Sequence, residues 1–383
     1  MERWKEVKTG WGAYDRRDGG EHDESAGPMG QSAAVERGPT TDAPVELELD
    51  SASKIDAVQN FSAKLTPMVS GRSDSFRLNF EHLTGSNAGS RLDTRWGALV
   101  ANILMQDRFQ HAHVEVTPPR KMAAATQLAR TGLMYALARH HDLEFSGDDG
   151  EFARKCQPWK RDWVPVKPQL SLFDLGGEGI EPTAVGEKVV AFVNPRSSRI
   201  EVNARRNAIY PWLLEYMGTA KSATTMEVLD DLSTTTTELI DNIQEHARTR
   251  NGILTISEVS GDHRERGSVQ IVALDDGQGV PASIRERDPS ADVESVMLGY
   301  LNGTQEARSG GRGAGFRKLA ELAAKYHARL TVASGPFEKG AKTILIDHDF
   351  AGDHIVRTVD HNENIDIHGT VVVIRIPHDT LTR

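Results

Sequence analysis

The chain of 383 residues contains a single cysteine, Cys156, which excludes an intrachain disulfide. Its longest largely apolar stretch, near Ala98–Met105, is far too short to span a bilayer, and its first residues lack the apolar core of a signal peptide. Basic residues are in the minority, and the formal net charge of −10 gives no sign of a nucleic-acid surface. These absences predict a cytoplasmic protein that binds neither membrane nor nucleic acid.

Apolar side chains are also scarce, at 38% of the residues, and the shortage is greatest at the start of the chain. Residues 1–50 hold twice as many acidic as basic residues and show almost no apolar periodicity. Such a segment cannot bury enough apolar surface to fold. We therefore expect a disordered acidic tail over 1–50, followed by enough chain for two domains with a core each.

Residues 51–205 predict a small α/β domain. Four segments show the required apolar patterning, with period two for strands and helical spacing for helices: 75–80 (strand), 96–105 (helix), 113–117 (strand) and 122–138 (helix). Strand, helix, strand, helix is the order of an α/β unit. Residues 146–188, rich in Pro and Gly, are expected to form a long loop before a further strand at 189–193.

A stretch near the middle of the chain, 233–247, combines an apolar face with three reactive side chains. At about 100° per residue, Glu238, Asn242 and His246 fall on one polar stripe of a helix. A carboxylate can orient a nucleophile, and an amide oxygen can ligate Mg²⁺, which takes few protein ligands. Polar residues four apart also occur on ordinary solvated helices, so later segments must decide between these readings.

Three such segments follow in order. The motif Asp-x-Gly-x-Gly begins at Asp275, directly after an apolar run that predicts a buried strand. The motif Gly-x-Gly-x-Gly begins at Gly311 and leads into an apolar-periodic helix, so its backbone N–H groups and the helix N-terminus form a ready anion site. A strand of β-branched residues that starts at Gly369-Thr370 closes the chain.

This order of motifs, with Glu-x₃-Asn-x₃-His first, resembles the GHKL ATP-binding domain, or Bergerat fold, of gyrase, Hsp90, histidine kinases, MutL and anti-sigma-factor serine kinases. The resemblance covers residues 206–383. It implies an α/β sandwich in which helices cover a mixed sheet, with ATP and Mg²⁺ as cofactors and a mobile ATP lid at 282–310. The domain at 51–205 loosely resembles the STAS-like modules that accompany GHKL domains in some signalling proteins.

The resemblance also implies a role for each motif residue. Asn242 would ligate Mg²⁺, and Glu238 would be the catalytic residue that activates a water or an acceptor hydroxyl. Asp275 would accept a hydrogen bond from the adenine amino group, with Thr370 supporting the same edge, while the side chain of Asp276 points away. The other implied cofactor-binding residues are Gly277 and Gly279 beside the base, Gly311, Gly313 and Gly315 around the phosphates, and His246.

The end of the chain departs from the family pattern. A polar segment, 347–368, holds four histidines and several aspartates before Gly369. Their irregular spacing favours a solvated loop over a metal site. This insertion leaves open whether Thr370 or Thr343 meets the adenine.

The destination of the phosphate depends on other features. A histidine kinase needs a phosphoacceptor helix, and the nearest candidate, His141-Asp142, lacks the Arg-x-Pro that should follow. Two classes remain. One is an ATPase or a serine/threonine kinase of the anti-sigma type, which the carboxylate of Glu238 favours. The other is an ATP-gated conformational or dimerisation switch with little or no turnover. A protein partner or substrate is expected in either case, and a homodimer remains an option.

Overall fold

The computed structural model describes part of the chain, all of it within one compact unit, Pro39–Arg383. The described residues are 45–48, 75–81, 83, 94–106, 109, 112–119, 128, 131–133, 136, 142–145, 181–182, 189–193, 226–243, 247, 249, 252–259, 267–301, 314–335, 342–350, 354–360 and 367–381. They form an α/β fold with two sheets. Within these ranges no helix is long and apolar enough to cross a membrane.

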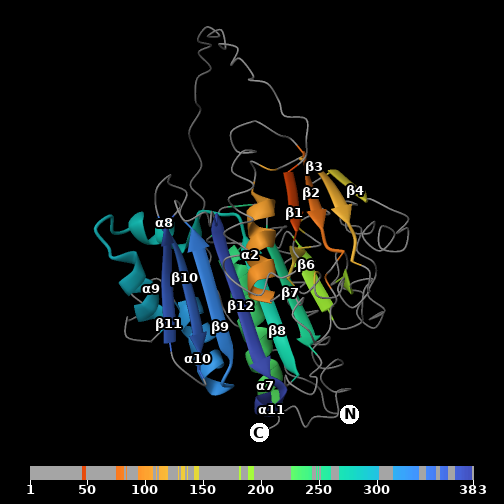
Figure 1. Cartoon of the computed structure of the whole chain (residues 1–383). Coiled ribbons are helices and arrows are strands. Elements are labelled where there is room, and N and C mark those ends of the chain that lie inside the picture. Colours follow the sequence, from red (N-terminus) through yellow and green to blue (C-terminus); the bar gives the residue numbers. More distant parts are fainter. Residues whose placement is uncertain are drawn as a thin grey trace, which may run out of the picture. The chain divides into compact units, whose positions relative to one another are not determined.

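Parallel strands form the smaller sheet, in the order β1-β2-β3-β4: Val45–Glu48 (β1), Ser75–Asn79 (β2), His113–Thr117 (β3) and Asp142–Phe145 (β4) (Figure 1). Burial alternates along β2 and β3, with Phe76, Leu78, Val114 and Val116 inside. Successive side chains of a strand point to opposite faces, which accounts for the period-two pattern of both segments. The two strand predictions at 75–80 and 113–117 are confirmed.

Strand β1 lies inside the segment expected to be a disordered tail, so that expectation is wrong for Val45–Glu48. The rest of 1–50 lies outside the described residues. Val-Glu-Leu-Glu alternates apolar and charged residues, a strand pattern too short to stand out in its acidic surroundings. Strand β4 was not predicted either, and it ends directly before the loop expected at 146–188.

The helix predicted over 122–138 is interrupted. Leu128 and Leu133 are helical and buried, but a turn separates them, with φ of +80° at Gly132. A Cβ on Gly132 would lie 3.0 Å from Cδ2 of Leu274, which belongs to the larger sheet. The left-handed backbone and this close approach both favour glycine. The prediction of one continuous helix is therefore wrong.

The larger sheet has the order β11-β10-β9-β12-β8-β7-β6-β5, and every pairing in it is antiparallel. Its strands are Glu181–Pro182 (β5), Val189–Val193 (β6), Gly252–Val259 (β7), Ser268–Asp275 (β8), Arg329–Gly335 (β9), Lys342–Asp349 (β10), His354–Asp360 (β11) and Gly369–Pro377 (β12). The expectation of a mixed sheet is wrong for the described strands, among which parallel pairing occurs in the smaller sheet and not in the larger one. Strand β12, last in the chain, lies between β8 and β9 at the centre.

Strand β6 confirms the strand predicted at 189–193, but β5 and β6 pair with the larger sheet. The boundary expected at residue 205 therefore separates two strands from the sheet to which they belong. β5 also lies inside the loop expected at 146–188. The expected boundary was the residue at which the resemblance to the GHKL domain begins. The pairing of β6 with β7 shows that the larger sheet extends across it.

Helices cover one face of the larger sheet: Met226–Asp241 (α7), Gly279–Arg285 (α8), Val293–Leu301 (α9) and Ala314–Lys325 (α10), with a short terminal helix, His378–Leu381 (α11). Their apolar side chains form one cluster with alternate residues of the central strands, including Ile240, Leu319, Ile271, Leu330 and Ile374. This cluster is the core that fixes α7 and α10 against the sheet.

Helix α2, Thr94–Met105, lies against the opposite face of the larger sheet and contacts β8 and β12 (Figure 1). Oγ1 of Thr94 donates to Oε1 of Gln270 at 2.6 Å, and Gln270 precedes the core residue Ile271, so the two point to opposite faces. Every residue from Trp96 to Met105 is buried. Apart from Asn102 these residues carry no polar side chain beyond the Trp96 indole, as expected for a helix segment buried on all sides, and the helix predicted at 96–105 is confirmed.

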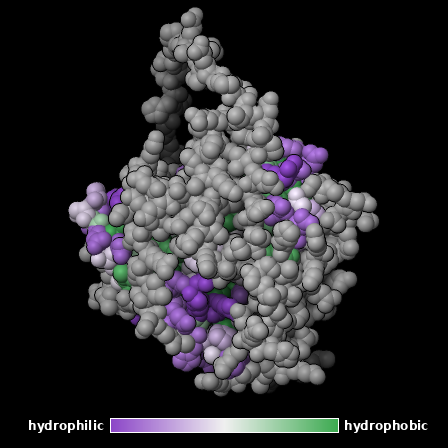
Figure 2. Space-filling model, in the orientation of Figure 1, coloured by the Kyte–Doolittle hydropathy of each residue, from purple (hydrophilic) through white to green (hydrophobic). Residues whose placement is uncertain are grey.

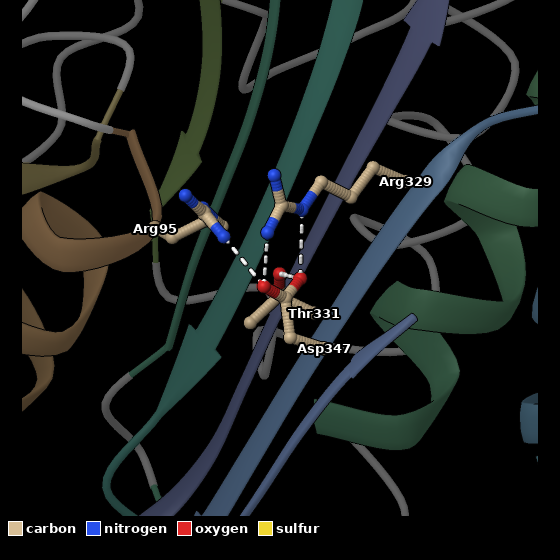
Figure 3. A network of polar contacts seen from close by, with 4 residues as sticks. All are labelled: Arg95, Arg329, Thr331 and Asp347. Carbon is tan, nitrogen blue, oxygen red and sulfur yellow. Dashed lines mark hydrogen bonds and ion pairs between the residues drawn. The ribbon is translucent and has the colours of Figure 1, made fainter. Parts of the chain in front are cut away.

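A polar network joins α2 to the larger sheet (Figure 3). The carboxylate of Asp347 accepts hydrogen bonds from Arg95 at 2.6 Å, from Thr331 at 2.9 Å and from Nε of Arg329 at 2.9 Å. Burial by itself raises the pKa of Asp347, but the hydrogen bonds and charges of the two arginines outweigh it and hold the pKa below its ordinary value. Figure 2 shows hydrophilic residues gathered over the lower ends of β9 and β12, on this side of the sheet.

Asp347→Asn should lower the free energy of unfolding by about 1–3 kcal/mol at pH 7, because it leaves two arginines without their shared carboxylate. This expected loss of stability is smaller than for a fully buried ion pair, since the side chain of Arg329 is 39% exposed. Chemical denaturation measures it. The control is Glu321→Gln, which breaks an exposed pair with Arg317 and should cost less than about 0.5 kcal/mol. Because the folded pKa of Asp347 is lowered, its stabilisation is complete above the ordinary pKa of 3.8 and is lost as pH falls further. Equal losses in both variants would contradict the structural role of the network.

Candidate functional site

A pocket opens on the helix-covered face of the larger sheet, where β8 ends and β12 begins. The register places Thr370 of β12 directly opposite Asp275 of β8. Apolar side chains from α7, α8 and the sheet line its floor: Leu239, Ile243, Ala273, Ile284 and Val372. The pocket is open to solvent, and its free space with the open mouth included is about 800 Å³.

Five residues singled out from the sequence line this pocket: Asn242, Asp275, Gly279, Gly315 and Thr370. They come from segments far apart in the chain, which the fold brings together. Glu238 and Gly277 adjoin them, as the contacts below show. His246, Gly311 and Gly313 lie outside the described residues.

Asp275 is the last residue of β8 and is only 5% exposed. Its Oδ1 accepts a hydrogen bond from the backbone N–H of Gly277 at 2.9 Å. Burial raises the pKa of Asp275 to about 7; the N–H groups of Gly277 and Thr370 oppose this shift, and the charge of Asp276 adds to it. Asp276 accepts a hydrogen bond from Thr249 and does not line the pocket, in agreement with the expectation that its side chain points away.

Of the two threonines considered from the sequence, Thr370 is the one that lies beside Asp275. Its Oγ1 lies 3.1 Å from Oγ of Ser334, and that hydroxyl also donates to the carbonyl oxygen of Gly369 at 2.9 Å. Thr343 lies on β10, and β9 and β12 separate this strand from β8. Thr370 therefore lines the pocket beside Asp275, and the buried Ser334 hydroxyl supports it from behind.

Two glycines allow the turn after β8 to close. A Cβ on Gly277 would lie 2.1 Å from the carbonyl oxygen of Ala247, which accepts the N–H of Gln278 at 2.9 Å. Gly279 has φ of +73°, and a Cβ there would lie 2.2 Å from the carbonyl oxygen of Gly335. The glycine at 277 thus has a packing reason of its own, the contact with Ala247 beyond the end of α7.

Helix α7 confirms the helix predicted around Glu238, and its regular part ends at Asp241. It then widens into a π turn at Asn242, whose carbonyl oxygen accepts the N–H of Ala247 at 3.1 Å, five residues on. Single π turns inside helices are frequent at functional sites. This one lies where Asn242 enters the pocket.

Glu238 lies beside Asn242 and the start of α10. A Cβ on Gly315 would lie 2.8 Å from Oε1 of Glu238 and 3.0 Å from Nδ2 of Asn242. Oε2 of Glu238 accepts a hydrogen bond from Nζ of Lys318 at 2.8 Å, and the Glu238 side chain is 21% exposed. A carboxylate, an amide and an ammonium group therefore gather at this end of the pocket.

Sequence reasoning missed Lys318 and four pocket-lining residues: Ser283, Arg287, Tyr300 and Phe316. Lys318 follows Gly315 by three residues in α10, and this helical spacing was the available signal. Arg287 and Tyr300 fall in the segment expected to be a mobile lid, 282–310, which carries no residue-level motif.

Within the segment expected to be a mobile lid, the end of α8 and the whole of α9 are helical. Val293, Met297 and Leu301 recur at helical spacing and are buried in the main core, so α9 is packed in place. Residues 302–310 lie outside the described residues.

The solvated loop expected at 347–368 is also wrong in part, since this segment contains the end of β10 and the whole of β11. His348 stacks on Phe350, with ring centroids 3.9 Å apart. Among the described residues, no group of three or more His, Cys, Asp or Glu is placed to hold a metal ion.

The chain matches no protein-family model, and no curated protein matches it either.

Proposed function

We propose that this chain is a Mg-ATP-binding signalling or regulatory protein whose C-terminal sheet and helices form a GHKL-type α/β sandwich. The observation that carries the proposal is the convergence of Asn242, Asp275, Gly315 and Thr370 on one pocket, with Glu238 beside them. These residues were selected from the sequence by motif, and they lie on separate elements. A chance set of motifs would not be expected to meet in one concave, mostly apolar site.

The end of the pocket formed by β8 and β12 suits the adenine base. Oδ1 of Asp275 accepts the N–H of Gly277, and the other carboxylate oxygen is the proposed acceptor for the exocyclic amino group. The apolar floor suits the faces of a flat ring. Thr370 supplies a hydroxyl beside the carboxylate.

The opposite end suits the phosphates. Asn242 would hold Mg²⁺ through its amide oxygen, and the start of α10 at Gly315 places a helix N-terminus beside it. Mg-ATP, when bound, supplies the transferable phosphoryl group. Glu238 would orient and deprotonate a water or an acceptor hydroxyl. Lys318 holds the Glu238 carboxylate in place through its 2.8 Å contact and contributes positive charge near the phosphates.

A hydrolase or a protein kinase is the function that Glu238 favours, since nucleotide binding alone needs no carboxylate at that position. The second candidate, an ATP-gated switch, is favoured by the hydrogen bonds that α2 makes behind the pocket. Incubation of the full chain with γ-labelled ATP, with and without candidate protein partners, separates them. Labelled protein indicates a kinase, free phosphate indicates an ATPase, and neither product together with saturable binding indicates a switch. Absence of binding would refute the proposal.

Gly315→Ala should weaken ATP binding by about tenfold and leave adenosine binding unchanged, because an added Cβ overlaps Oε1 of Glu238 and Nδ2 of Asn242 and displaces both side chains from their present positions at the phosphate end. The phosphate end would change while the base end stays intact. Titration with both ligands measures the effect. Equal losses of affinity for adenosine and ATP would contradict the assignment of the start of α10 to the phosphate site.

A further inference from the structure

Asn102, on α2, reaches the rear of the pocket from the opposite side of the sheet. Its side chain is fully buried, and its Nδ2 donates to the backbone oxygen of Asp275 at 2.6 Å and to that of His368 at 2.7 Å. Two carbonyl acceptors fix the orientation of the amide, because a flipped amide would turn its oxygen toward both. In the described part of the chain, Oδ1 of Asn102 has no hydrogen-bond partner, so the amide is kept there at an energetic cost.

The two acceptors belong to the strand ends that form the base end of the pocket. Asp275 ends β8, and His368 directly precedes Gly369, the first residue of β12. These ends are packed tightly, since a Cβ on Gly369 would lie 2.2 Å from the backbone oxygen of Asp275 and 2.5 Å from its Oδ1. Movement of either strand end would therefore shift the Asp275 carboxylate relative to Thr370.

Helix α2 is held on the sheet at its other end as well. Thr94 donates to Gln270, and Arg95 pairs with Asp347 at 2.6 Å. The residues between these contacts and the end of the helix, Trp96–Met105, are all buried. The helix is thus a packed element that runs from the ion network to the rear of the pocket.

We propose that Asn102 is a positioning residue of the nucleotide site and that, through it, nucleotide binding is coupled to the seating of α2 on the larger sheet. The inference rests on the proposed nucleotide site. Asn102 does not line the pocket, so it acts through the backbone of β8 and β12. Coupling of this kind is reciprocal: if the seating of α2 tightens nucleotide binding, the nucleotide tightens the seating of α2 by the same factor.

The test compares two variants of the full chain. Asn102→Leu keeps the side-chain size and removes both hydrogen bonds behind the pocket. Thr94→Val removes one hydrogen bond of the same helix to the same sheet, far from the pocket, and serves as the control. Adenosine and ATP are titrated into each protein, and unfolding curves report stability. Asn102→Leu should weaken adenosine and ATP alike, by on the order of tenfold, while Thr94→Val stays within about twofold of the wild type.

Unchanged adenosine affinity in a folded Asn102→Leu protein would overturn the inference, as would equal losses in the two variants. If Asn102→Leu does not fold, hydrogen exchange of the wild type decides: adenosine should slow exchange of the amides of residues 97–105, and an unchanged rate overturns the coupling. Failure of the wild type to bind adenosine or ATP would refute the nucleotide site itself, which distinguishes that outcome from failure of the Asn102 inference alone.

Discussion

Asp275→Asn is expected to weaken ATP binding by about ten- to a hundredfold, because a charge-assisted hydrogen bond in a desolvated pocket contributes roughly 1.5–3 kcal/mol. Oδ1 of Asp275 is occupied by the N–H of Gly277. The amide of an asparagine would therefore present its NH₂ group, a donor, to the adenine amino group, also a donor. Isothermal titration with Mg-ATP at pH 8 measures the loss.

Asp276→Asn is the matched control, since Asp276 bonds to Thr249 and does not line the pocket. It should change ATP affinity far less. The charge of Asp276 helps to raise the pKa of Asp275, so its removal should, if anything, tighten binding near neutral pH. Losses of ATP affinity of equal size in the two variants would contradict the proposal that Asp275 binds the adenine base.

The raised pKa of Asp275 predicts opposite pH dependences for ATP affinity and for protein stability. The pKa of Asp275 is raised from 3.8 to about 7, so the folded protein keeps a proton that the unfolded chain releases between these values. The stability of the nucleotide-free protein should therefore fall as pH rises through this window, by up to about 4 kcal/mol in total. Asp275→Asn should remove this slope and make the nucleotide-free protein more stable at pH 8 while it binds ATP less well.

Binding should follow the reverse trend, because only the ionised carboxylate accepts the adenine amino hydrogen. ATP affinity of the wild type should fall by about tenfold per pH unit below pH 7, with release of a proton on binding. Titrations in two buffers of different ionisation enthalpy detect that proton. A flat pH profile in the wild type would contradict the assignment.

Glu238→Gln should reduce turnover by about 10²- to 10⁴-fold while ATP still binds, because the amide keeps the shape of the side chain but cannot accept a proton. The expected split between turnover and affinity follows from the position of Glu238 beside Asn242 and not among the residues that line the base end. Steady-state phosphate release, or phosphate transfer to a protein substrate, together with ATP titration, measures both quantities.

Glu227→Gln makes the same chemical change on the same helix, where Glu227 pairs with Lys325 at the protein surface. Turnover should be unaffected by it. Full turnover in Glu238→Gln would refute the catalytic role of Glu238. The proposed role of Asn242 in binding Mg²⁺ would be unaffected. A wild type that binds ATP but turns over none, with any partner tested, would favour the switch.

Local patterns of apolar residues in the sequence predicted individual strands and helices well. The apolar run before Asp275 became the fully buried strand β8, and the apolar periodicity around Glu238 became α7. Helix α7 starts earlier than expected, at Met226, so that the threonines before Glu238 lie inside it. Threonine is a poor helix former, but Oγ1 of Thr236 donates back to the carbonyl oxygen of Leu232 at 2.7 Å and is buried there.

Features that depend on distant contacts could not be predicted in this way. The pairing of β6 with β7 crosses the expected domain boundary, and no local pattern specifies it. The position of Asn102 behind Asp275 joins residues 173 apart in sequence, and the contact of Lys318 with Glu238 joins residues 80 apart. In the sequence alone, Asn102 looks like an isolated polar residue in an apolar helix, and Lys318 looks like an ordinary solvated lysine.

Titration of the full-length wild type with Mg-ATP and, separately, Mg-GTP at pH 8 is the most direct measurement. The Asp275 carboxylate should accept a hydrogen bond from the amino group of adenine but repel the carbonyl oxygen that guanine presents at the same position. We therefore expect saturable ATP binding that is at least about tenfold tighter than GTP binding and is weakened in Asp275→Asn. Equal affinities for the two nucleotides, or no binding of either, would contradict the proposed nucleotide site.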